Sequence, residues 1–442
     1  MSTPSLIKIS GLLKHQLDAG TTTASAIKEE IDNGFDAGAR RVLVKVDTRT
    51  GKLYVVDDGA GMTREDAEHA YYIHNNKAAS EKNGLRGIGK TNAEAYLSNL
   101  EKPTCTYTDA GGDMIEIVAD WPESVAKSEW NPSVSRRGRA SREAEAVWET
   151  HKLAPHGTVV EIPLHPARLR DIVAKLPEFL ADMATTYQFL LPDRQVSVVV
   201  DDDTKELPED DCLGWDKVGD DNRNEAGLQC WRNGSDLLIY HTEGSEWVRF
   251  DYDKGINGAR IRDHDVVVAP ESGWILIGTF VAKWVYNPAD RTELGYTAFV
   301  RNNRLLFRMA NACTRPRGMF DKREFVSRSR MVIFGTHKED VLVHPLGNKS
   351  AYTPETIDAD LLRYVRRLAD WWATKYHARE KKRLAAMPLP PDGPAAAGGG
   401  EPINGEVAQL TKKEWKLVYN YEDGDEEFRR ELRELLRRYL PE

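Results

Sequence analysis

The sequence has few cysteines and no long apolar run. Four cysteines occur in 442 residues. Their positions, Cys105, Cys212, Cys230 and Cys313, show no paired spacing, which argues against a zinc site or a disulfide framework and favours a reducing compartment. No stretch approaches the roughly 18 consecutive apolar residues that a membrane-spanning helix needs, and the N-terminus lacks the apolar core of a secretion signal. We therefore expect a soluble, cytoplasmic protein with no membrane partner.

An excess of positive charge is also missing. Lys and Arg number 61 against 70 Asp and Glu, so the formal net charge is −9. An acidic chain is not a general nucleic-acid coat, so any contact with DNA would have to be local. The length of 442 residues allows two or three domains with ample core.

The most informative stretch is Ala24–Ala39, whose apolar residues recur at the spacing of a helix. Its face opposite the apolar one carries Glu29, Asn33 and Asp36. A carboxylate, an amide and a second carboxylate in one line suit a magnesium–nucleotide site, because Mg²⁺ prefers oxygen ligands and an attacking water needs a nearby base. A solvated polar face is the alternative interpretation.

Two glycine-containing stretches follow this helix. Asp57–Met62 joins a carboxylate, at the end of a strand predicted for 52–56, to alternating glycines that would let a ligand approach the backbone. Asp57 could accept a hydrogen bond from an exocyclic amine. Gly84–Thr91 opens a helix predicted for 92–100, and the free amides at a helix N-terminus can bind phosphate. Each stretch by itself could be an ordinary turn.

Taken together with Gly157-Thr158 at the start of a later strand, these stretches resemble the sequence boxes of the Bergerat ATP-binding fold. This fold defines the GHKL superfamily, which includes DNA gyrase, a heat-shock chaperone, histidine kinases and MutL. The resemblance covers about residues 6–164. It implies that Glu29 is the general base that activates the attacking water, that Asn33 is the magnesium ligand, and that ATP and Mg²⁺ are the cofactors. The nucleotide-binding residues that it implies are Asn33, Asp36, Asp57, Gly59, Gly61, Met62, Lys77, Gly84, Leu85, Arg86, Gly87, Ile88, Gly89, Lys90 and Thr158.

The resemblance also implies individual roles. Asp57 would bind the adenine amine, and Thr158 would support Asp57 and a water molecule. Gly84–Lys90 would form the hinge of a lid whose amides hold the phosphates.

We expect an α+β chain with several parts. The first is a Bergerat-type α/β sandwich, the ATP-binding domain, at 1–190, and the second is a ribosomal-S5-like α/β transducer domain at 191–352. A helical C-terminal segment follows, with a helix at 353–387, a flexible linker at 388–405 and a helical tail at 406–442. Strands of the second domain are expected at 196–200, 236–241, 247–252, 265–269, 274–284 and 295–301.

Two further segments have a sequence-based prediction. The basic segment Ser124–Lys152 is predicted to be a flexible surface loop. Within the helix at 353–387, apolar side chains at a three- to four-residue spacing would face either the core or a partner; these are Leu361, Val365, Leu368 and Trp372.

The second domain contains a strand, a turn at Asn302-Asn303 and a returning strand. This pattern resembles the transducer domain of MutL-like and Microrchidia-like ATPases. By that resemblance a lysine of this domain reaches the γ-phosphate, where it would stabilise charge on the transferred phosphoryl group. Lys349 is the candidate for this catalytic role, and Lys322 is a second candidate.

These patterns predict a slow, magnesium-dependent ATPase that acts as an ATP-gated conformational clamp. It would form an ATP-dependent homodimer in a DNA-related or multi-protein system, with DNA or a protein as the possible partner. A non-hydrolysing ATP sensor and a chaperone-like ATPase stay open as alternatives. A histidine kinase is disfavoured, because no helix with a phospho-accepting His precedes the ATP domain and kinases generally lack a carboxylate at the position of Glu29.

Overall fold

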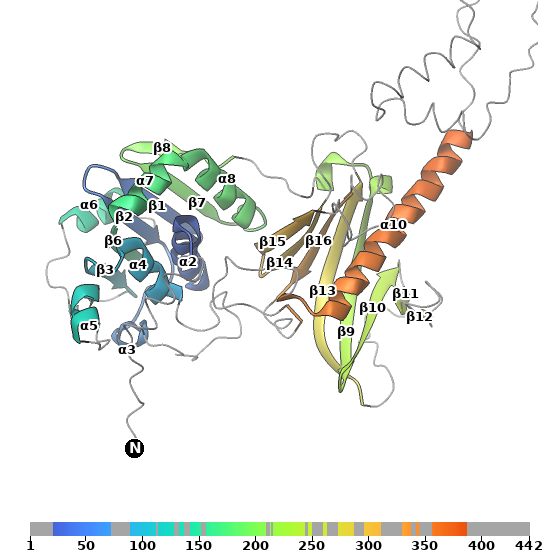
Figure 1. Cartoon of the computed structure of the whole chain (residues 1–442), viewed down its shortest axis with the longest axis horizontal. Coiled ribbons are helices and arrows are strands. Elements are labelled where there is room, and N and C mark those ends of the chain that lie inside the picture. The colour runs from blue at the N-terminus through green and yellow to red at the C-terminus, as the bar shows by residue number, and fades with distance from the viewer. Residues whose placement is uncertain are drawn as a thin grey trace, which may run out of the picture. The chain divides into compact units, whose positions relative to one another are not determined.

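The computed structural model divides the chain into two compact units, Met1–Lys381 and Lys382–Glu442. Figure 1 shows its helices and strands. The residues that the structure describes are 21–71, 89–111, 114–127, 132–136, 142–151, 156–208, 213, 215–243, 246–249, 260–262, 273–286, 296–310, 329–336, 342–343 and 356–386.

The first sheet has eight strands in the order β5-β4-β3-β6-β2-β1-β7-β8. Neighbouring strands are antiparallel except β1 and β7, which run parallel. The strands are β1 (Arg41–Asp47), β2 (Lys52–Asp57), β3 (Thr104–Asp109), β4 (Ile115–Ala119), β5 (Ser133–Arg136), β6 (Gly157–Pro163), β7 (Gln195–Val200) and β8 (Asp203–Lys205).

Helices cover both faces of this sheet (Figure 1). They are α2 (Thr23–Asp36), α3 (Arg64–His69), α4 (Gly89–Ser98), α5 (Trp121–Lys127), α6 (Arg142–His151), α7 (Pro166–Ala174) and α8 (Leu176–Tyr187). Successive strand residues point to opposite faces, so Val44 packs with α2, α4, α7 and α8, whereas its neighbour Leu43 packs with α6. The sheet is therefore apolar on both sides, as a layer between helices must be.

Two segments of this sheet differ from the prediction. The strand at 196–200, assigned from sequence to the second domain, is β7 and pairs with β1 in the first sheet. The surface-loop prediction for Ser124–Lys152 is wrong where residues are described, because this segment contains β5 and α6. The basic residues obscured a short helical pattern in which Ala144, Val147 and Trp148 are buried against the sheet.

The second sheet also has eight strands, in the order β12-β11-β10-β9-β13-β16-β14-β15. Only β14 and β16 pair in parallel. Its strands are β9 (Arg223–Asn233), β10 (Asp236–Glu243), β11 (Glu246–Arg249), β12 (Arg260–Arg262), β13 (Ile275–Tyr286), β14 (Tyr296–Arg301), β15 (Arg304–Ala310) and β16 (Ser329–Gly335). Two short 3₁₀ helices, Trp215–Lys217 and Asp220–Asn222, precede β9.

The predicted turn at Asn302-Asn303 is confirmed. Both residues have a positive φ, 48° and 62°, and asparagine tolerates this left-handed region better than most residues. β9 and β16 were not predicted, and the strand predicted at 265–269 lies outside the described residues.

Helix α10 (Ala359–Ala386) packs its apolar face on the second sheet (Figure 1). Leu361, Val365, Leu368 and Trp372 are buried in one cluster with Trp284 of β13. The choice between core and partner that the sequence left open is therefore resolved in favour of the core. Two sheets with packed helices confirm the expected α+β class, and no helix within the described residues is long and apolar enough to cross a bilayer.

The burial of the second sheet predicts a contrast between two isoleucines. Ile333 of β16 is 0% exposed, whereas Ile275 of β13 is 69% exposed. Ile333→Ala should lower the free energy of unfolding by about 2–5 kcal/mol, because it leaves a cavity in a packed core. The matched control Ile275→Ala should change it by less than about 0.5 kcal/mol. Denaturant unfolding measures both, and equal losses would contradict the assignment of β16 to the core.

Candidate functional site

Helix α2 presents the first group of predicted site residues. It begins with a capping box, in which Thr22 Oγ1 accepts from Ser25 N–H at 3.1 Å and Ser25 Oγ accepts from Thr22 N–H at 2.9 Å. Glu29 and Asn33 lie one turn apart and are half-buried. This partial burial differs from the fully solvated polar face that was the alternative interpretation.

The end of α2 lies directly against the end of β2. A Cβ on Gly34 would lie 3.0 Å from Asp57 Cβ, and one on Gly157 would lie 2.1 Å from the Asp57 carbonyl oxygen. Asp57 is buried and accepts a hydrogen bond from Gly59 N–H at 2.8 Å. Thr158 is its direct partner in the pairing of β2 with β6. The fold thus brings Asp57, Gly59 and Thr158 together from two separate stretches of sequence.

The loop after β2 is tied to β3. Met62 N–H donates to Thr108 Oγ1 at 2.8 Å, and the hydroxyl of Thr108 lies 3.3 Å from that of Thr158. Gly61 has φ +67°, and a Cβ there would lie 2.1 Å from the Asp109 carbonyl oxygen. Sequence reasoning missed Thr108, because a threonine within a strand carries no signal of its own.

Glu29 lies at the N-terminus of α4. A Cβ on Gly89, the first residue of that helix, would lie only 2.3 Å from Glu29 Oε2. Only a glycine fits beside this carboxylate without a shift of the side chain. The positive end of the α4 dipole and the candidate base are therefore neighbours.

Lys90 makes ionic contacts with two buried carboxylates. Its Nζ lies 2.6 Å from Glu94 Oε1 and 3.6 Å from Glu30 Oε2. The predicted role of Lys90 in phosphate binding stays a prediction. The other predicted lid and transducer residues lie outside the described residues; they are Lys77, Gly84, Leu85, Arg86, Gly87, Ile88, Lys322 and Lys349.

Burial changes the protonation of two carboxyl groups in this region. It raises the pKa of Asp57 from 3.8 to about 6, although the bond from Gly59 N–H opposes the rise. It also raises the pKa of Glu30 to about 7, against the effect of the Lys90 ammonium. The carboxyl groups of Asp57 and Glu30 therefore change their protonation state closer to neutral pH than exposed carboxyls do.

The part of the chain that the structure describes has no group of three or more His, Cys, Asp or Glu side chains that could hold a metal ion. A nucleotide-bound Mg²⁺ needs only one or two protein ligands, because phosphates and waters supply the rest. Asn33 fits this requirement. Its amide nitrogen donates to Glu30 Oε2 at 3.4 Å, so its amide oxygen is the atom suited to a hard cation.

Asp32, next to Asn33, is tied to the second sheet. It is 0% exposed and accepts hydrogen bonds from Tyr187 OH at 3.1 Å and from Arg304 Nε at 3.0 Å. Arg304 comes from β15, directly after the Asn302-Asn303 turn. Helix α2 therefore has a buried ionic contact on a residue adjacent to the predicted magnesium ligand.

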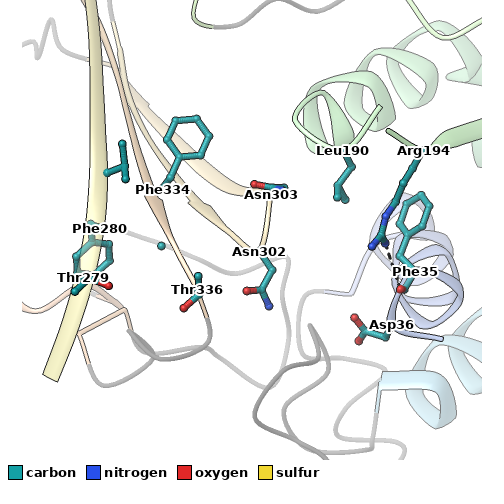
Figure 2. Close-up of a pocket in the computed structure, with 12 residues that line it drawn as sticks. Phe35, Asp36, Leu190, Arg194, Thr279, Phe280, Asn302, Asn303, Phe334 and Thr336 are labelled. Carbon is teal, nitrogen blue, oxygen red and sulfur yellow. Dashed lines mark hydrogen bonds between the residues drawn. The ribbon is translucent and has the colours of Figure 1, made fainter. Parts of the chain in front are cut away.

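Asp36 lies at a separate pocket of about 570 Å³ (Figure 2). Of the predicted site residues that the structure describes, Asp36 alone lines it, so this pocket is not the site around Asp57. Arg194 at its edge donates to the Phe35 carbonyl at 3.2 Å. The other lining residues are Leu190, Thr279, Phe280, Val281, Asn302, Asn303, Phe334, Gly335 and Thr336.

Comparison with known proteins identifies the N-terminal part of the chain. Residues 21–133 match a family model described as the histidine kinase-, DNA gyrase B- and HSP90-like ATPase. Residues 21–133 are therefore similar to the ATPases of the GHKL superfamily. The GHKL match includes Glu29, Asn33 and Asp57 and stops before Thr158, which the fold nevertheless pairs with Asp57.

The similar GHKL proteins include several that are named DNA mismatch repair protein MutL. The one from Halalkalibacterium halodurans is 30% identical over 122 residues, which cover 25% of this chain and 19% of that protein. The one from Anaeromyxobacter sp. (strain K) is 35% identical over 118 residues, or 24% and 19%. The one from Koribacter versatilis is 50% identical over 52 residues, or 12% and 8%. The chain thus matches about a fifth or less of the length of these relatives.

The buried carboxyl of Asp57 in this GHKL domain predicts a pH-dependent stability. In the folded state Asp57 keeps its proton up to about pH 6, whereas in the unfolded state it keeps it only up to about pH 3.8. The free energy of unfolding of the wild type therefore falls as the pH rises from about 3.8 to about 6. Asp57→Asn removes this loss of stability. Its free energy of unfolding should exceed the wild-type value by on the order of 2–3 kcal/mol at pH 8 and match it below about pH 4.

Asp58→Asn is the control of opposite sign. Hydrogen bonds from Arg41 and Arg40 lower the pKa of Asp58 against the effect of burial, so this variant should be less stable than the wild type at pH 8. Denaturant unfolding at several pH values measures both differences. A constant difference between Asp57→Asn and the wild type across the pH range would contradict the raised pKa.

Proposed function

We propose that this protein is a slow, magnesium-dependent ATPase that uses ATP as the signal for a conformational clamp. The observation that carries the proposal is the position of the Glu29 carboxylate beside Gly89 at the N-terminus of α4. A base beside a set of free helix amides is the arrangement that hydrolysis of a phosphoanhydride needs, since the amides bind the phosphates and the base activates water.

In the proposed reaction, the chain's own residues bind ATP and orient and deprotonate the attacking water. Asp57 accepts a hydrogen bond from the adenine amine, with Thr158 beside it. The main-chain amides of Gly84–Lys90 bind the phosphates. Asn33 would hold Mg²⁺, which when bound neutralises phosphate charge. Glu29 orients a water molecule and takes its proton as the water oxygen bonds to the γ-phosphorus and ADP leaves.

The remaining parts of the proposal concern the whole chain. The division into an ATP-binding domain, which was expected at 1–190 but whose sheet extends through β8 to Lys205, a transducer-like domain that follows it up to 352 and the C-terminal parts is a proposal, as is the reach of Lys349 or Lys322 to the γ-phosphate. We also propose an ATP-dependent homodimer. The MutL names of the relatives support a DNA-related system with a DNA or protein partner, although the match covers only a small part of those proteins.

Removal of the candidate base tests the proposal. Glu29→Ala should bind ATP within about threefold of the wild type but lower kcat by about 10²–10⁴-fold, because proton transfer to a positioned base contributes that much. Binding is measured by calorimetry and turnover by phosphate release. The control Glu178→Gln, at an exposed position of α8, should leave both unchanged. Undiminished turnover by Glu29→Ala would remove the central claim.

Replacement of the candidate metal ligand gives a different expected pattern. Asn33→Ala should weaken binding of Mg-ATP by at least about tenfold, because a lost ligand costs metal affinity. Binding of ATP in the presence of EDTA should change much less. An equal loss with and without Mg²⁺ would assign Asn33 a structural role. A wild-type protein that binds ATP and never hydrolyses it would favour the ATP sensor instead.

A further inference from the structure

Lys90 is a largely buried cation between two helices. Its side chain is 13% exposed, whereas the side chains of Glu94 and Glu30 are 0% and 1% exposed. Glu94 lies one turn further along α4, and Glu30 lies on α2. The ammonium therefore joins the helix that carries Glu29 to the helix that begins beside it.

Glu94 is itself held firmly. Tyr71 OH donates to both of its oxygens, at 2.8 and 2.9 Å, and Thr104 Oγ1 donates to Oε2. Trp121 Nε1 donates to Thr104 at 3.1 Å. The carboxylate that holds Lys90 is thus fixed by Thr104 of β3 and by Tyr71 in the turn after α3, and Trp121 of α5 supports Thr104.

The charge of Lys90 depends on these carboxylates. Burial alone would lower the pKa of Lys90, but Glu30 and Glu94 raise it above its usual range. If the ammonium moved to a phosphate, it would leave the buried carboxylate of Glu94 without its nearest cation, which is strongly unfavourable. The network therefore favours an ammonium that stays between the helices.

The contact lies next to the proposed chemistry. Glu30 follows Glu29, and Lys90 follows Gly89, whose backbone abuts the Glu29 carboxylate. Any shift of Lys90 relative to Glu30 would move the base relative to the α4 amides. We propose that Lys90 is a positioning residue, which holds the N-terminus of α4 against Glu29 through Glu94 and Glu30 and whose side chain does not bind phosphate. This inference rests on the proposed ATPase function, and it differs from the phosphate-binding role predicted from the sequence.

Three variants of the full chain test the proposal: Lys90→Met, Glu94→Gln and the double variant. Lys90→Met should lower kcat by about tenfold or more, because small displacements of a base are costly. The ratio of its affinities for ATP and adenosine should stay within about threefold of the wild type, since no phosphate contact is lost. Lys90→Met/Glu94→Gln should keep the low kcat of Lys90→Met, because the bridge between the two helices is still missing, while its unfolding midpoint should recover, because the unpaired charge is removed along with the cation.

The exposed pair Lys127 and Glu123 provides a matched control. It has the same i,i+4 spacing, on α5, with side chains 63% and 55% exposed. Lys127→Met and Lys127→Met/Glu123→Gln should leave kcat and the affinity ratio unchanged. A loss of kcat in these control variants would show that removal of an exposed Lys–Glu pair lowers kcat as well. The loss in Lys90→Met would then no longer support a positioning role for Lys90, and the proposal would be overturned.

A phosphate ligand would give the opposite result. Lys90→Met would then weaken ATP binding by about tenfold or more while leaving adenosine binding intact, and Glu94→Gln would not restore it. That outcome overturns the proposal. If Lys90→Met does not fold, the double variant supplies the decision, because it lacks the ammonium and should keep the wild-type affinity ratio only under the positioning role.

The ATPase proposal itself is tested separately, by ATP binding and turnover of the wild-type protein. If the wild type binds ATP without turnover, hydrolysis is disproved, and the affinity ratio together with the unfolding midpoint still decides the role of Lys90. The midpoint should fall in Lys90→Met and return in the double variant. If the wild type binds no ATP, both proposals fall.

Discussion

The buried carboxylate of Asp57 depends on close approach of backbone from three directions. Gly59 of the loop after β2 and Gly157 of β6 leave no room for a Cβ beside it, and a Cβ on Gly34 of α2 would be in tight contact with Asp57. Because the backbone approaches so closely at these glycines, the end of the first sheet packs tightly around this single ionisable group. This packing brings the half-buried polar face of α2 beside the end of β2, where the other site residues gather.

Two acidic residues near the middle of α2 are neutralised by different partners. Glu30 belongs to a network with Lys90 of α4 that is completed by Glu94 and Tyr71. Two residues later, Asp32 is neutralised by Arg304 of β15. The helix thus has an apolar face, a polar face with Glu29 and Asn33, and two buried ionic contacts. These contacts restrict how the helix can rotate, and they help explain why its polar residues keep one orientation.

The sequence predicted the elements whose pattern is local. The helix with Glu29, the strand that ends at Asp57 and the Asn302-Asn303 turn follow from periodicity and turn chemistry, and the structure has them within a few residues. The pairing of strands that are far apart in the sequence was harder to predict. β7 joins the first sheet by a parallel pairing with β1, which no local pattern encodes. Helix α6, with the buried Trp148, was not predicted, because the charged residues around it made the segment resemble a surface loop.

The candidate site shows the same limit. Glu29, Asn33 and Asp57 could be selected because their residue types and spacing suit a nucleotide, and the fold brings Asp57 and Thr158 together. The two-carboxylate environment of Lys90 could not be anticipated, since it depends on how α4 packs on α2. The Asp32–Arg304 contact has a mechanical consequence. With both side chains at most 5% exposed, a rotation of α2 must either carry β15 with it or leave a bare charge in the interior. This contact therefore couples the rotation of α2 to the position of β15.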